Sequence, residues 1–116
     1  MTLNEATQRL DAQKHNTCTW QQKVQWISEL DGLTKKLLFG QDFPGYGENT
    51  SGATVLQIPA PFSEAYLYYM ESKIDYQNGE FTRFNNAYAM FRATWQRYAD
   101  SVIREGKQLQ TPGKFQ

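Results

Sequence analysis

Residues 62–105 read FSEAYLYYMESKIDYQNGEFTRFNNAYAMFRATWQRYADSVIRE, with an apolar side chain at nearly every third or fourth position. This spacing is typical of an α-helix that packs one face against a protein core. The apolar series consists of Leu67, Met70, Ile74, Phe81, Phe84, Tyr88, Phe91, Trp95, Tyr98 and Val102, and Gln77 is its one polar member. The stretch therefore predicts helix over most of its length and places the protein in the all-α class.

Asn78-Gly79 is the one strong helix breaker in this stretch. Glycine inside a helix costs about 1 kcal/mol, and an Asn-Gly pair can end a helix. Because the apolar spacing continues through the pair without a shift, we expect one long C-terminal helix over residues 62–105, kinked near Asn78. At 1.5 Å per residue it would be roughly 65 Å long, so its far end would rest on another copy or a partner. The alternative is two helices that meet at Gly79.

Two shorter helices are predicted before this stretch. Leu3, Ala6 and Leu10 are three and four residues apart and indicate an amphipathic helix over about residues 2–12. Thr19 and Gln22 have the spacing of a capping box, so a second helix begins there and continues to about residue 38. Its broad apolar face combines two stripes, one with Trp20, Val24, Ile27 and Asp31 and one with Trp26, Leu30, Leu33 and Leu37, and leaves Lys23, Glu29 and Lys35 outside.

The two other segments lack helical periodicity. Residues 39–61 are rich in glycine and proline, which predicts a long loop inserted into a single helical domain over residues 1–105. Within it, residues 54–58 (TVLQI) favour one short β-strand or hairpin, which would need a partner from the same loop or from a neighbouring subunit. Residues 106–116 are predicted to form an extended tail.

Composition narrows the class of function. Twelve lysine and arginine residues balance twelve aspartate and glutamate residues, so the chain lacks the charge of a typical nucleic-acid binder. The single cysteine indicates no internal disulfide, and no apolar run approaches the ~20 residues that span a bilayer, so we expect synthesis in the cytoplasm. Seventeen aromatic residues are many for a domain of this size, and they favour either an aromatic core or a protein interface.

The residues that carry catalysis are sparse. His15 and Cys18 could supply two ligands of a metal site but not four, and no nucleophile motif accompanies them. Glu64, Glu71 and Asp75 lie on one predicted helix, and we expect them to form an acidic face exposed to solvent and not a site of acid–base catalysis. We therefore expect neither an enzyme nor a bound metal or cofactor. Asn85-Asn86 is unusual inside a helix, and these two amides either face water or form hydrogen bonds across a subunit contact.

Four stretches carry a resemblance to a known family. Residues 23–32 read KVQWISELDG, residues 59–70 PAPFSEAYLYYM, residues 74–80 IDYQNGE and residues 83–91 RFNNAYAMF. In order and spacing they cover most of residues 19–98, and the chain resembles the head–tail connector (adaptor, neck) proteins of tailed bacteriophages and prophages. The pattern contains no catalytic signature, so it indicates lineage more than mechanism.

The resemblance implies a helical virion protein that forms a homo-oligomeric ring of about twelve copies under the portal protein. Such a ring extends the DNA channel, through which DNA passes without sequence-specific binding, and gives the tail or stopper protein a docking surface at the neck. For subunit contacts we expect the loop over residues 40–58 and the aromatic helix face, with Val55, Ile58, Tyr66, Tyr69, Phe84, Asn85, Asn86 and Tyr88. For the portal contact we expect the tail, with Gly106, Lys107, Leu109, Pro112 and Phe115.

Two other functions remain open at this point. The first is another phage structural component, such as a tail-completion or head-fibre protein. The second is a small helical regulatory protein that binds a protein or DNA, although the chain has no basic recognition helix. None of these functions involves a membrane.

Overall fold

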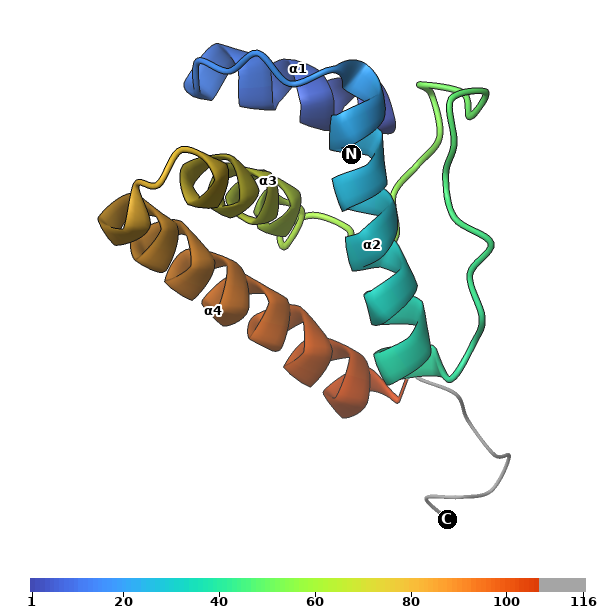
Figure 1. Cartoon of the computed structure of the whole chain (residues 1–116). Coiled ribbons are helices and arrows are strands. Elements are labelled where there is room, and N and C mark those ends of the chain that lie inside the picture. The colour runs from blue at the N-terminus through green and yellow to red at the C-terminus, as the bar shows by residue number, and fades with distance from the viewer. Residues whose placement is uncertain (107–116) are drawn as a thin grey trace.

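The computed structural model describes residues 1–106, which form four α-helices (Figure 1). Helix α1 spans Leu3–Gln13, α2 spans Trp20–Phe39, α3 spans Glu64–Gln77 and α4 spans Phe81–Glu105. The all-α class is confirmed, and α4 is the long C-terminal helix. The predicted tail lies outside the described residues except for Gly106, which caps α4 with a φ of 69°. No helix within residues 1–106 has the length and apolar character needed to cross a membrane.

The prediction of one continuous helix over residues 62–105 is wrong, and the alternative of two helices is correct. Helix α3 ends at Gln77, Gly79 adopts a left-handed φ of 71°, and α4 begins at Phe81 and folds back along α3 (Figure 1). The backbone N–H of Glu80 closes the turn by donating to the carbonyl of Asp75 at 2.9 Å. The reversal lets the apolar rows of α3 and α4 pack on each other, whereas a straight helix would leave both without a partner.

Helix α3 occupies the centre of the molecule and contacts the other three helices. In Figure 1 it lies between α1 and α4, and α2 crosses beside it. The core between these helices is made of fully buried side chains, among them Leu3, Leu10, Ile27, Ile58, Tyr66, Leu67 and Met70. The apolar positions predicted for the first two helices therefore do face the interior, except Leu33 and Leu37, which are 48% and 61% exposed.

Both N-terminal helices begin at capping threonines. The Thr19 hydroxyl accepts a hydrogen bond from the backbone N–H of Gln22 at 3.1 Å, as the sequence predicts for α2. A complete capping box lies at α1, where Thr2 accepts from the Glu5 N–H at 3.2 Å and the Glu5 carboxylate accepts from the Thr2 N–H at 3.1 Å. These caps satisfy amides that have no partner inside a helix.

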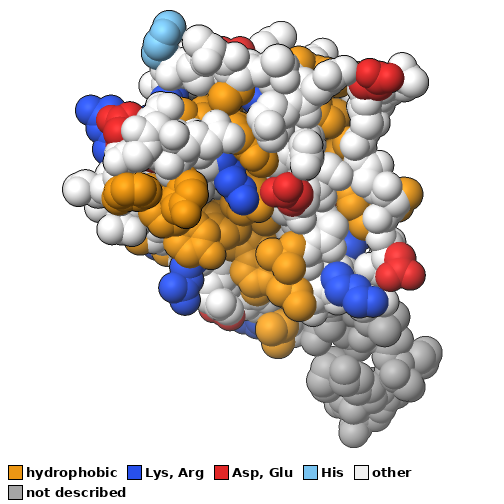
Figure 2. Space-filling model, in the orientation of Figure 1, with side chains coloured by type: hydrophobic (Ala, Val, Ile, Leu, Met, Phe, Trp, Pro, Cys, Tyr) orange, Lys and Arg blue, Asp and Glu red, His pale blue; other side chains and the backbone are white. Residues whose placement is uncertain are grey.

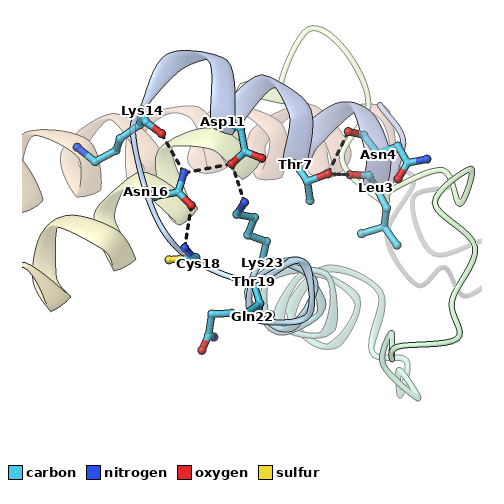
Figure 3. Close-up of polar contacts among 10 residues, drawn as sticks. All are labelled: Leu3, Asn4, Thr7, Asp11, Lys14, Asn16, Cys18, Thr19, Gln22 and Lys23. Atoms are coloured by element: carbon cyan, nitrogen blue, oxygen red, sulfur yellow. Dashed lines mark hydrogen bonds and ion pairs between the residues drawn. The ribbon is translucent and has the colours of Figure 1, made fainter.

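The prediction that Lys23 lies outside the packed face of α2 is wrong. Its side chain is 6% exposed, and its ammonium lies 2.6 Å from Oδ1 of Asp11 on α1 (Figure 3). Asn16 holds the connection between α1 and α2 in shape, because its side-chain amide donates to Asp11 Oδ1 and to the carbonyl of Lys14, while its oxygen accepts from the Cys18 N–H. Lysine is tolerated here because its aliphatic stem packs while its ammonium finds a carboxylate.

The long loop between α2 and α3 contains no β-strand. Within residues 1–106 the β pairing consists of one isolated antiparallel bridge between Thr2 and Val55. The partner is thus the start of the chain itself, and not the same loop or a neighbouring subunit as predicted. The first-turn amides of α1 have no helical acceptor, and the carbonyls of Thr54 and Gly52 accept from the N–H groups of Leu3 and Asn4 at 3.0 and 2.9 Å.

Candidate protein-binding interface

An open groove of about 630 Å³ lies where α2, α3 and α4 meet. Its lining is mainly aromatic: Trp26 from α2, Tyr69, Ser72, Lys73, Tyr76 and Gln77 from α3, and Phe84 and Tyr88 from α4. Figure 2 shows a broad hydrophobic area on the side of the molecule where α4 and α2 face the viewer. The turn at Gly79 creates this groove, because it brings the aromatic residues of α3 and α4 to the same side.

The rings of the groove form a ladder in which each ring contacts the next. Tyr76 meets Phe84 edge to face at 5.4 Å between ring centroids, Phe84 stacks on Tyr88 at 5.6 Å, and Tyr88 contacts Phe91 at 5.7 Å. Phe91 is buried and also contacts Tyr69 at 5.0 Å, so the ladder is anchored in the core. Tyr76 and Tyr88 nevertheless remain 61% and 39% exposed. Rings held by their neighbours present a contact surface at low entropic cost.

One side of the groove carries a small polar cluster. The hydroxyl of Tyr69 donates to Oε1 of Glu29 on α2 at 3.2 Å, and the Lys73 ammonium lies 3.8 Å from the same oxygen. The ammonium also sits 5.1 Å from the centre of the Tyr69 ring. Partial burial, and secondarily the negative charge of Glu29, raise the pKa of the Tyr69 hydroxyl. The cluster orients Tyr69 and places one positive and one negative charge beside the aromatic lining of the groove.

Exposed apolar side chains continue beyond the groove. Phe81 at the start of α4 is 58% exposed, and Leu33 and Leu37 on α2 are 48% and 61% exposed. Between these helices, Trp95 packs against the core and donates its indole N–H to the Thr34 hydroxyl at 3.0 Å. We call the groove together with Phe81, Leu33 and Leu37 the apolar face. Large exposed apolar areas mark interaction sites in folded proteins.

A buried carboxylate holds the long loop to the helices. Asp31 on α2 is fully buried and accepts hydrogen bonds from the hydroxyls of Tyr66 and Tyr46 and from the N–H of Gln57 at 3.3 Å. Burial raises the pKa of Asp31 above its ordinary value, and the hydrogen bonds it accepts offset only part of that effect. These partners come from α3 and from two points of the loop. The Asp31 cluster therefore acts as a structural clamp below the surface and not as part of the groove.

The structure separates the predicted subunit-contact residues into three groups. Tyr69, Phe84 and Tyr88 are brought together in the groove. Ile58 and Tyr66 are fully buried in the core, so their prediction as contact residues is wrong, because no neighbour can reach them in this fold. The remaining three, Val55, Asn85 and Asn86, are exposed but do not line the groove.

Asn85 and Asn86 are exposed on α4, as both predictions for these amides require. Of the predicted portal-contact residues, Lys107, Leu109, Pro112 and Phe115 lie outside the described residues.

Two of the candidate acid–base residues form ion pairs with basic residues of the first part of the chain. Asp75 is buried and its carboxylate lies 2.6 Å from the Lys14 ammonium, so the expected solvated acidic face is wrong for this residue. Glu64 pairs with Arg9 of α1 at 2.9 Å. Burial raises the pKa of Glu71, and the nearby Lys14 partly opposes that shift. These contacts attach α1 to α3, which is a structural role.

Metal-binding residues do not cluster in the described part of the chain, since no group of three His, Cys, Asp or Glu side chains there could hold an ion. Comparison of the chain with protein-family models, with curated proteins and with solved structures gives no match.

Proposed function

We propose that this chain is a structural assembly protein, namely a head–tail connector (adaptor) subunit of a tailed bacteriophage or prophage. In this role it forms a ring of about twelve copies under the portal protein, as the connector-like residues of the sequence suggest. The ring extends the DNA channel and gives the tail or stopper protein a docking surface. Its place of action is the neck of the virion.

The apolar face is the observation that carries the proposal. Tyr76, Phe81 and Leu37 are each about 60% exposed, although aromatic and aliphatic side chains gain free energy when they leave water. Tyrosine and phenylalanine are also enriched at the centres of protein interfaces. A chain that presents these residues together on rigid helices is suited to bind another protein surface.

The charge balance supports the same role. Equal numbers of acidic and basic residues give a net charge of zero, so a ring of such chains has no overall attraction for the phosphate backbone. Several of the charges are also engaged between helices, as Lys14 with Asp75 and Lys23 with Asp11. A channel with these properties lets DNA pass without holding it.

Ring geometry sets a further requirement. In a closed ring the contact between neighbours is heterologous, so one patch of each subunit meets a different patch of the next. The contact is repeated at every position of the ring, so a weak pairwise affinity is sufficient once the portal aligns the subunits. The apolar face provides one of the two patches.

The experiment measures the mass of the purified chain by light scattering, alone and after mixing with the portal protein of the same phage or prophage, with negative-stain imaging. We expect a ring of the chain on the portal. The double variant Tyr76→Ser/Tyr88→Ser should lose ring formation. Ile103→Ser, an equally exposed apolar position of α4 outside the apolar face, should retain it. A stable small dimer that ignores the portal would overturn the proposal in favour of another virion component or a regulatory protein.

A further inference from the structure

We propose that the side of the α3–α4 pair opposite the groove is the second patch of the ring contact, and that it receives the groove of the neighbouring copy. In this contact Lys73 and Tyr88 of one copy meet Glu71 and Met90 of the next. The inference deepens the proposed function, on which it rests for the existence of a ring. It supplies the partner surface that a heterologous contact needs.

The opposite side of the two helices is hollowed as well. Two hollows of about 280 and 360 Å³ lie there, and they adjoin because both are lined by Tyr68 of α3 and Met90 of α4. We call them together the second groove. Within residues 1–106 it shares no lining residue with the first groove. Met90 is 48% exposed, and a methionine thioether adapts its shape and packs well against an aromatic ring such as that of Tyr88.

The two grooves carry complementary charges. Glu71 lines the second groove and forms no ion pair within residues 1–106, since the nearby Lys14 is engaged with Asp75 at 2.6 Å. Lys73 lines the first groove, where its side chain remains 40% exposed although it lies 3.8 Å from Glu29. An ammonium on one patch and an unpaired carboxylate on the other attract each other and set the register of a contact.

The antiparallel packing of α3 and α4 sets which residues share a level along the pair. The ring of Tyr69 contacts that of Phe91 at 5.0 Å between centroids, and Tyr76 contacts Phe84 at 5.4 Å. Counted inward from these two contacts, residues 71–73 of α3 lie at the level of residues 87–89 of α4. The charged pair and the apolar pair of the proposed contact therefore lie side by side on the two helices.

Within each pair, the two side chains lie on opposite sides of their helix. Glu71 and Lys73 are two positions apart, as are Tyr88 and Met90, which corresponds to about 200° around an α-helix and about 3 Å along it. The side chains thus point about 160° apart, and in a closed ring of twelve copies the two patches of a subunit face directions about 150° apart.

Rotation about a ring axis parallel to the two helices keeps every residue at its own level. It therefore brings the first groove of one copy to the second groove of the next without a shift along the helices. Lys73 then faces Glu71 of the neighbouring copy, and Tyr88 faces its Met90. A contact of the first groove with itself would instead bring the two Lys73 ammonium groups to the same interface, which like charges disfavour.

The test exchanges the two charges between copies. Glu71→Lys places two ammonium groups at the contact and Lys73→Glu places two carboxylates there, so each variant alone should associate at least about tenfold more weakly than the wild type. An equimolar mixture of the two variants should regain the wild-type association, because in an alternating ring every contact again joins opposite charges. Asp100→Lys, the same charge change at an exposed position of α4 outside both grooves, should associate as the wild type does.

Light scattering of the full chain at up to about 1 mM, alone and with the portal protein, measures the association. Far-UV circular dichroism checks that each variant keeps the helix content of the wild type. Met90→Ser tests the apolar half of the contact without a change of charge and should weaken assembly, whereas Ile103→Ser, at 56% exposure outside both grooves, should not. If a charge variant lost helix content, this second comparison would decide.

Three results would overturn the inference. The first is assembly of both single charge variants as in the wild type, and if these rings form on the portal the proposed function stays intact. The second is a mixture of folded variants that assembles no better than each variant alone. The third is a wild type that assembles neither alone nor on the portal, which would overturn the proposed function as well. Recovery in the mixture without any ring on the portal would support the contact and contradict the function.

Discussion

The hydroxyl of Tyr66 donates a hydrogen bond to Asp31 and accepts one from the backbone N–H of Ile58 at 2.7 Å. Tyr66 belongs to α3, Asp31 to α2 and Ile58 to the loop between them, and all three residues are fully buried. One hydroxyl therefore satisfies two polar groups that have no access to water. Buried polar groups without such partners are costly, so this contact is central to the stability of the fold.

Replacing Tyr66 by phenylalanine should reveal that cost. Tyr66→Phe removes the hydroxyl and leaves the Ile58 N–H and one Asp31 oxygen without their partner, so we expect a loss of about 3 kcal/mol in the free energy of unfolding. Denaturation in urea, followed by circular dichroism, measures it. Tyr68→Phe is the matched control, because the Tyr68 hydroxyl has no hydrogen-bond partner within residues 1–106, and it should change stability by less than about 0.5 kcal/mol. Equal effects of the two substitutions would contradict the role of the Tyr66 hydroxyl.

The same buried tyrosine predicts a loss of stability in alkali. Burial, and then the charge of Asp31, raise the pKa of Tyr66 well above its ordinary value. The stability from this difference is complete below the unfolded pKa of about 10 and is lost as the pH rises, because the unfolded chain ionises first. Above pH 10 the free energy of unfolding should fall by about 1.4 kcal/mol per pH unit for Tyr66 alone. Urea denaturation at pH 9, 10 and 11 measures the slope, and Tyr66→Phe should make it shallower; an unchanged slope would refute the assignment.

The ion pair between Lys23 and Asp11 should respond unequally to loss of its two members. Asp11→Ala leaves the buried ammonium of Lys23 without a partner, so we expect a loss of about 2 kcal/mol at pH 7. Lys23→Met keeps the packed stem and leaves a carboxylate that is 53% exposed to water, so the loss should stay below about 1 kcal/mol. Thermal or chemical denaturation measures the two losses of stability. A larger loss for Lys23→Met than for Asp11→Ala would contradict this interpretation.

Acid should weaken the Lys23–Asp11 pair. The hydrogen bond from Lys23 is the main cause that lowers the pKa of Asp11 in the folded state. The stability from this shift is therefore present above the unfolded pKa of about 4 and is lost as the pH falls through the folded value. The difference in the free energy of unfolding between the wild type and Asp11→Ala should therefore shrink when urea denaturation of both proteins is measured at decreasing pH. A difference that stays constant down to acid pH would contradict the role of this pair.

The turn between α3 and α4 can be tested by whether one substitution, Gly79→Ala, lowers or raises the stability of the protein. Gly79 has a left-handed φ of 71°, and a Cβ there would have open space around it. Gly79→Ala should therefore destabilise the protein by about 1 kcal/mol through backbone strain alone. In a continuous helix the same change would stabilise by a similar amount, because alanine is the better helix former. Gly47→Ala, in open space without a left-handed φ, is the control and should have little effect on the urea midpoint.

Local chemistry made the helices predictable. The hydroxyl of Thr19 begins α2 as its spacing with Gln22 indicates, and the apolar positions Leu3, Ala6 and Leu10 mark α1 within a residue at each end. The Thr2–Glu5 capping box could have been found by the same spacing rule. The groove could be predicted only in part. The sequence predicts Tyr69, Phe84 and Tyr88 as interface candidates, whereas Trp26 and Tyr76 join them only through the arrangement of three helices.

The amino-acid sequence by itself determined the all-α class, the positions of the first two helices, the neutral charge and the excess of aromatic residues, because these follow from spacing within one or two turns. Only the tertiary structure decided that the chain reverses at Gly79, that Asp31 clamps the loop through Tyr66, and that Lys23 is buried against Asp11. The physical reason is that apolar residues at a constant spacing are compatible both with one straight helix and with two helices that pack on each other. The choice between them depends on which arrangement removes more apolar surface from water, and that quantity belongs to contacts between residues far apart in the chain.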